Sequence, residues 1–190
     1  MILTIKRYLW GAALSFMGMV GICILMHPGT LATYEFGISE FGAIRATQVP
    51  FFIGFAATAA FFSLIGWRLR GDRFLNTVFL ITAFCLIGIA ATSYPVNRLW
   101  YDLHWCIVIA LGFNVLTAMV WRAKSRSISK ADCVLAAIFI AITVISFLPI
   151  LRHIPILRSF ILREVIGFIT SFWFLGRAAL LAVEDRDKPA

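Results

Sequence analysis

TSYPVNRLWYDLHW, residues 92–105, is the longest aromatic and polar run between two apolar segments of this 190-residue chain. The flanking segments, residues 74–92 and 103–121, are each long enough to cross a bilayer, because a helix of about 20 residues spans the hydrocarbon core. The run between them carries Asn97, Arg98, Asp102 and His104. It therefore predicts a turn at a membrane surface between two transmembrane helices.

Apolar runs of the same length recur on both sides of this turn. The predicted spans are residues 8–26, 49–67, 74–92, 103–121, 133–151 and 163–183, followed by a polar tail at 184–190. None of them alternates polar and apolar residues as a membrane β-strand does. The sequence predicts an all-α integral membrane protein, a single domain built as a six-transmembrane-helix bundle.

The composition supports lipid as the solvent for much of this chain. Hydrophobic residues make up 62% of it and charged residues 14%, whereas a soluble domain is about half apolar and about a quarter charged. The net charge of +8 does not indicate nucleic acid as a partner, because the positive residues occur in short groups between apolar runs. Groups placed in this way set membrane orientation.

The distribution of Lys and Arg predicts that orientation. Of the 17 such residues, five fall on one predicted side of the membrane: Arg45, Arg98, Arg152, Arg158 and Arg163. The other twelve share a side with both chain ends. Because cytoplasmic loops are enriched in Lys and Arg, we expect both termini in the cytoplasm and the protein in a bacterial inner membrane.

Polar residues gather at the predicted outer level. They are Ser39, Glu40, Arg45, Asn97, Arg98, Asp102, His104, Arg163 and Glu164. Such groups near a bilayer are costly unless paired or wet, so they are either ordinary interfacial residues, an ion-pair network, or a site. As a site, Glu40, His104 and Glu164 are the candidate catalytic groups, and His27, His104 and His153 the candidate metal ligands. No H-x-x-x-H or H-E-x-x-H spacing is present, and no cofactor is predicted.

Two of the predicted spans, residues 163–183 and 103–121, also carry polar residues within the membrane. Glu164 shares a helical face with Gly167 and Ser171, and a stripe of small residues usually faces protein, so we expect Glu164 to pair with an Arg or His inside the bundle. Arg177 is expected to extend to the inner surface.

Asn114 lies about 15 Å deeper than His104. It is expected to form hydrogen bonds to a neighbouring helix, or to mark a polar path.

Three segments carry a resemblance to a known family. They are HPGTLATYEFGISEFGAIRATQVPFFIGF at 27–55, YPVNRLWYDLHW at 94–105 and ILREVIGF at 161–168. Together they resemble the six-span bacterial membrane family catalogued as domain of unknown function nine-nine-eight, with a layout similar to autophagy-modulator and GPI-remodelling membrane proteins. The resemblance implies a six-helix membrane protein and singles out Ser39, Glu40, His104 and Glu164. It implies no established reaction.

Three functions fit these observations. The first is an accessory, structural or lipid-binding membrane subunit, whose partners are the bilayer and other membrane subunits or further copies of the chain. The second is a membrane-embedded hydrolase or metal-binding protein at the outer leaflet, using His104, Glu40 and Glu164. The third is a small transporter with a polar path through Asn114.

Overall fold

The computed structural model describes residues 1–32, 37–93, 98–124, 129–146 and 160–186, and these ranges contain helices and no β-strand. The α-helices are α1 (Ile2–Met26), α2 (Gln48–Arg68), α3 (Arg73–Thr92), α4 (Arg98–Lys124), α5 (Lys130–Ser146) and α7 (Phe160–Arg186). Two 3₁₀ helices, η1 (Pro28–Ala32) and η2 (Ile38–Gly42), lie between α1 and α2.

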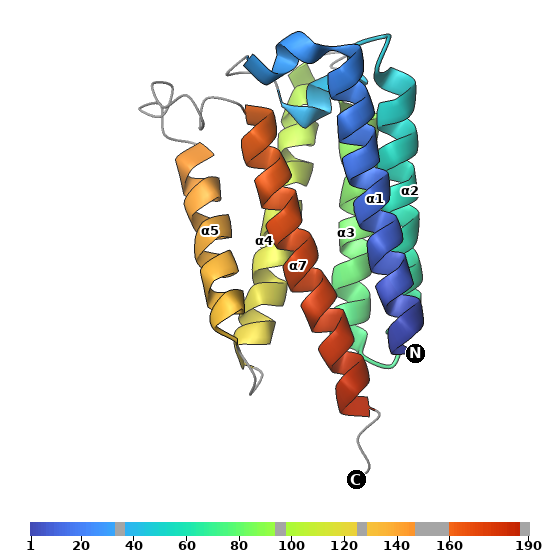
Figure 1. The fold of residues 1–190 in the computed structure, drawn as a ribbon, viewed down its shortest axis with the longest axis vertical. Coiled ribbons are helices and arrows are strands. Elements are labelled where there is room, and N and C mark those ends of the chain that lie inside the picture. Colours follow the sequence, from blue (N-terminus) through green and yellow to red (C-terminus); the bar gives the residue numbers. More distant parts are fainter. Residues whose placement is uncertain (33–36, 94–97, 125–128, 147–159, 187–190) are drawn as a thin grey trace.

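The α-helices run along one axis, and α1 begins at the same end of the bundle at which α7 ends (Figure 1). We call this the terminal end. The opposite end carries η1 and η2 and is called the capped end. α7 contacts α1, α3, α4 and α5, so it is the central helix of the bundle.

Five helices are long and apolar enough to cross a membrane: Ile2–Met26, Gln48–Arg68, Arg73–Thr92, Arg98–Trp121 and Ile161–Glu184. This confirms the all-helical class and its membrane character. α5 has 17 described residues, which is at the short limit for a span. The predicted span 133–151 continues past Ser146 into residues outside the described part of the chain, and the sixth span stays a prediction.

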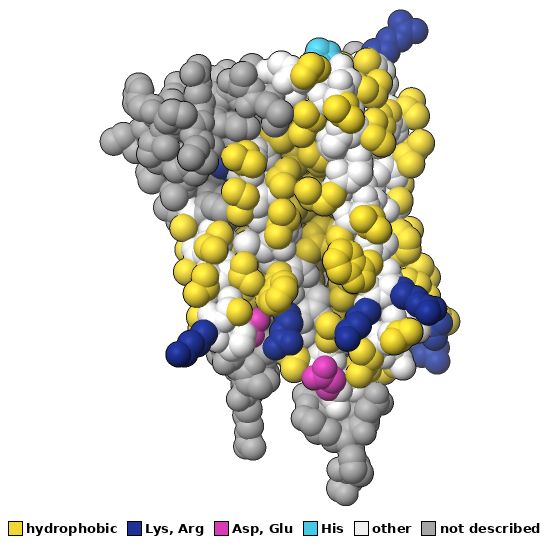
Figure 2. Space-filling model, in the orientation of Figure 1, with side chains coloured by type: hydrophobic (Ala, Val, Ile, Leu, Met, Phe, Trp, Pro, Cys, Tyr) yellow, Lys and Arg dark blue, Asp and Glu magenta, His cyan; other side chains and the backbone are white. Residues whose placement is uncertain are grey.

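The surface between the two ends is apolar. Trp10, Leu25 and Phe84 expose 68%, 82% and 75% of their area. Figure 2 shows hydrophobic side chains over the length of the bundle, with most of the visible Lys and Arg near the terminal end. Large apolar side chains exposed on this scale are unfavourable in water and favourable against lipid.

Aromatic rings join α7 to α1 and α2. Phe16 of α1 stacks on Phe168 of α7 with 4.1 Å between ring centroids. Phe62 of α2 lies 5.0 Å from Phe172 of α7, and Phe55 meets Phe16 and Phe168 edge to face. Each ring buries about 150–250 Å², so these contacts fix the position of α7 in the core.

Glycines let α1 and α2 approach closely. A Cβ added to Gly54 would lie 2.2 Å from the Cβ of Met19, and one added to Gly11 would lie 2.5 Å from the Phe61 ring. Small residues at such positions are the usual means by which membrane helices pack, because lipid supplies no hydrophobic force between them.

α5 is positioned by a cap that also reaches α7. The Ser129 backbone N–H donates to the Asp132 carboxylate at 3.0 Å, and the Asp132 N–H donates to the Ser129 hydroxyl at 3.1 Å. This is a reciprocal capping box. The buried Asp132 carboxylate also accepts from Trp173 Nε1 at 3.4 Å and lies 3.8 Å from Arg177 Nε.

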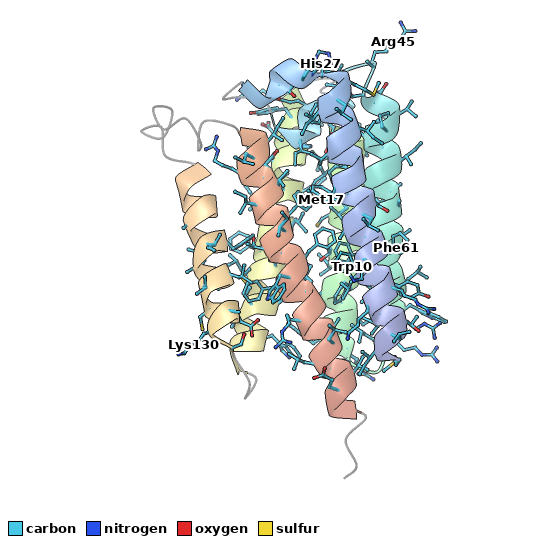
Figure 3. The ribbon with its side chains drawn as sticks, viewed as in Figure 1. Trp10, Met17, His27, Arg45, Phe61 and Lys130 are labelled. Atoms are coloured by element: carbon cyan, nitrogen blue, oxygen red, sulfur yellow. The ribbon has the colours of Figure 1, made fainter. Side chains whose placement is uncertain are left out.

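The segment between α1 and α2 folds over the capped end. Ile38 and Phe41 of η2 are buried, and the Thr47 hydroxyl donates to the Phe41 carbonyl at 2.7 Å. Arg45 follows η2, is exposed and extends away from the bundle, while His27 lies at the same end (Figure 3). η2 thus brings backbone N–H groups over the end of α7.

Candidate functional site: a membrane cavity with a charged end

Two carboxylates meet the backbone at the start of η2. The Gly37 N–H donates to Glu40 at 2.8 Å, and the next N–H along the chain, that of Ile38, donates to Glu164 of α7. Glu40 and Glu164 are predicted to lie at one level of the membrane, and in the structure they are close enough to interact electrostatically. Ser39, which lies between Ile38 and Glu40 in the chain, is half-buried.

The described hydrogen bond of Glu164 comes from the backbone, and its pairing with an Arg or His side chain stays a prediction. The donor of that bond is the Ile38 N–H. The neighbouring Arg163 is 1% exposed, and its positive charge acts on Glu164. The capped end of α7 therefore holds one cationic and one acidic side chain, with the exposed Glu40 beside them.

A cavity of about 460 Å³ begins at this pair and continues along the inside of the bundle. Its walls come mainly from α4 and α7, with single or paired residues from α2, α3 and α5. The lining residues are Phe62, Thr82, Leu86, Trp105, Val108, Ile109, Leu111, Gly112, Phe113, Val115, Leu116, Phe139, Arg163, Glu164, Gly167, Phe168, Ser171, Phe172 and Leu175. Apart from Thr82 and Ser171, the polar lining residues are the two charged ones at the capped end.

Two glycines keep the cavity open. A Cβ added to Gly112 of α4 or to Gly167 of α7 would meet no atom within 4 Å. Gly167 and Ser171 line the cavity on the same face as Glu164. The stripe of small residues on α7 therefore faces the inside of the protein, as predicted, and borders a space instead of a closely packed helix.

His104 of α4 forms a hydrogen bond with α3. Its Nδ1 lies 2.9 Å from the Thr92 hydroxyl oxygen. That hydroxyl donates its one hydrogen to the Gly88 carbonyl at 2.7 Å, so Nδ1 is assigned as the donor toward Thr92. His104 is not among the cavity lining residues, and the described contacts do not bring it to Glu40 or Glu164.

Asn114 joins α4 to α3, the helix-to-helix contact expected of it. Its Nδ2 donates to the Val78 carbonyl and to the Thr82 hydroxyl, at 2.9 Å each. It is buried and does not line the cavity. The described cavity therefore gives no polar path through Asn114.

The remaining candidate residues are scattered. Arg98 and Asp102 are exposed in the first turns of α4, and His27 is exposed beyond α1. Asn97 and His153 lie outside the described residues. Within the described ranges, no group of three or more His, Cys, Asp or Glu side chains could hold a metal ion.

Two features of the structure do not emerge from the sequence analysis. The first is Asp132, whose contact with Arg177 holds that side chain at α5; the S-x-x-D spacing of Ser129 and Asp132 before an apolar run is the signal that predicts such a cap. The second is the cavity, which has no signal in the sequence because its walls come from separate helices.

Comparisons with models of protein families, with curated proteins and with solved structures find no match to this chain. The family resemblance of its loop and helix motifs stays a prediction.

Proposed function

We propose that this protein is a six-span bacterial inner-membrane protein, with both termini cytoplasmic, that binds the hydrocarbon chain of an amphipathic membrane molecule in its cavity. The observation that carries this proposal is an apolar space of about 460 Å³ with Arg163 and Glu164 at one end. Binding sites for small molecules are typically about 300–1,000 Å³, apolar, with a few polar groups that orient the ligand.

The topology rests on three observations. Five helices have the length and composition of spans, and α5 stands among them as a sixth helix whose predicted window extends beyond its described residues. The start of α1 and the end of α7 lie at one end of the bundle, which suits an even number of crossings. Twelve of the 17 Lys and Arg residues belong to that end by sequence.

The lining favours an amphiphile over a water-soluble solute. The polar groups concentrate at the capped end, and the deeper wall is formed by side chains such as Phe62, Val115 and Leu175. A polar solute moved to that depth would lose its hydration and meet the hydroxyls of Thr82 and Ser171, which already donate within their own helices; such poorly compensated burial costs several kcal/mol. A hydrocarbon chain loses nothing there, and its polar head can remain among the charged residues.

Native mass spectrometry of protein gently extracted from its own membranes tests this function. We expect the wild-type protein to retain a lipid-sized adduct, and Gly112→Leu or Gly167→Leu to lose it, because each substitution places a side chain in open space within the cavity. Gly18→Leu is the matched control: Gly18 lies on the exposed face of α1, and a Cβ there also meets no atom within 4 Å.

The proposal requires that both cavity variants stay folded, shown by helical circular dichroism and a single gel-filtration peak, while losing the adduct. Equal retention by all four proteins would mean that the lipid sits on the outer surface. Absence of any retained lipid from the folded wild-type protein would also overturn the proposal.

A further inference from the structure

We propose that the cavity selects a zwitterionic phospholipid whose headgroup carries both a phosphate and a primary ammonium group, drawn from the leaflet at the capped end. This rests on the proposed lipid-binding function and names its ligand class. Three observations on the described residues support it: the depth of the cavity, the pair of opposite charges at its end, and the way in which Glu164 is held.

The depth of the cavity matches one leaflet. On α7 its lining extends from Arg163 to Leu175, twelve positions apart, which is about 18 Å at about 1.5 Å per residue. Half of a hydrocarbon core of about 30 Å is about 15 Å. One acyl chain of that leaflet therefore reaches the bottom of the cavity while its headgroup stays near Arg163, in the first turn of the α7 span.

The charges at this end are of both signs. Arg163 is the cationic side chain among the described lining residues and Glu164 the acidic one. A guanidinium fits the oxygens of a phosphate and can bind them through two parallel N–H bonds. With Glu40 also near Glu164, the described residues at this end present two carboxylates and one guanidinium to a headgroup with only negative charge.

Glu164 has one carboxylate oxygen committed and one available. One oxygen accepts the Ile38 N–H, while the other makes no hydrogen bond to a described residue. A primary ammonium is a compact donor of three hydrogen bonds and satisfies this oxygen. A quaternary ammonium has no N–H to donate, and a glycerol headgroup has no positive charge.

The test is competitive lipid binding to the full-length protein in detergent, read by native mass spectrometry. The probes are phosphatidylethanolamine, phosphatidylcholine and phosphatidylglycerol with identical acyl chains. We expect phosphatidylethanolamine to bind roughly tenfold better than either competitor, the size of effect that a charge-assisted hydrogen bond gives.

Glu164→Gln is the decisive variant, because its amide oxygen can still accept the Ile38 N–H while the charge is lost. It should bind the three lipids about equally and keep the fold. Glu184→Gln is the matched control, at the exposed terminal end of the same helix, and should keep the preference.

The outcomes distinguish failure of the headgroup inference from failure of the proposed chain-binding function. Equal binding of the three lipids by the wild-type protein, or a preference for phosphatidylglycerol, overturns the headgroup inference and leaves the chain-binding function standing. A preference that persists in Glu164→Gln also overturns it. Failure of every lipid to bind, with Gly112→Leu behaving like the wild-type protein, sinks the proposed function itself.

Discussion

At the scale of single residues, Asn114 shows how one polar side chain joins two membrane helices. Its amide donates to a backbone carbonyl and a hydroxyl of α3, in a buried position. In lipid such bonds are worth about 0.6 kcal/mol on average and up to roughly 1.7 kcal/mol. The modest value reflects an unfolded state in which the same groups find other partners within the membrane.

We expect Asn114→Leu to lower the free energy of unfolding by about 0.6–1.7 kcal/mol, measured by equilibrium unfolding in detergent micelles. Leucine has the same number and branching of side-chain heavy atoms as asparagine, so the substitution leaves no cavity and the loss reports mainly the hydrogen bonds. Thr117→Val is the control, because the bond that the described structure gives the Thr117 hydroxyl goes to the Phe113 carbonyl of its own helix. A loss in the control as large as in Asn114→Leu would contradict a role in joining α4 to α3.

The residue scale also shows what position along a helix can and cannot predict. Glu40, His104 and Glu164 share a level, and the sequence shows this because depth follows from distance along each span. Which of them meet depends on the rotation of each helix and on the path of the loop. Glu164 turns toward η2 and His104 toward Thr92 of α3, and neither direction can be read from spacing alone.

At the scale of elements, α5 is attached to the bundle largely through α7. Its N-terminal cap supplies the polar part of that contact, because Asp132 reaches both Trp173 and Arg177. The predicted span begins at residue 133, directly after Asp132, so a prediction from apolar windows leaves this side chain out. The partners of Asp132 come from a helix about 40 positions later in the chain.

We expect Asp132→Ala to loosen α5 more than a lost cap alone. Asp132 is the N3 half of the capping box whose N-cap is Ser129, and its loss from the box costs at most the value of an N-cap side chain, about 1 kcal/mol. Loss of the contacts to α7 adds about 1 kcal/mol, or roughly fivefold in local opening. Hydrogen–deuterium exchange of the α5 amides measures this opening.

Asp72→Ala is the matched control for that measurement. Asp72 caps α3 by accepting the Leu75 N–H at 3.0 Å, and the described structure gives it no bond to another helix. Exchange in α3 after Asp72→Ala should rise by the effect of the cap alone. An equal rise in the two helices would show that Asp132 contributes nothing to the docking of α5.

At the scale of the whole molecule, the orientation in the membrane decides which leaflet the cavity faces. The bundle places Arg45, at the capped end, opposite to the loop between α2 and α3 that holds Arg70. The class of the fold could be predicted because most of its spans lack charges over a full membrane thickness. The cavity could not, because it depends on side chains missing from Gly112 and Gly167 on separate helices.

Labelling of single cysteines in intact cells tests this orientation, in a parent protein whose four native cysteines are replaced by alanine. We expect a membrane-impermeant maleimide to label Arg45→Cys and Arg152→Cys from outside, and Arg70→Cys only after permeabilisation. The cysteine-free parent should stay unlabelled. Labelling of Arg70→Cys alone would reverse the orientation, and protection of Arg152→Cys with Arg45→Cys labelled would mean that α5 does not cross.

The two glycines of the cavity lie on separate helices, and under the proposed function each sets the space left for the lipid chain at its own position. Gly167 is four positions after Arg163, about 6 Å from the charged end, whereas Gly112 belongs to the part of the wall that α4 forms. Leucine at either position is expected to block the chain, whereas a single added methyl group would only narrow the space there. Under the proposed function, homologous proteins could be tuned to acyl chains of different width by exchanging a single residue, with no change in how the helices pack.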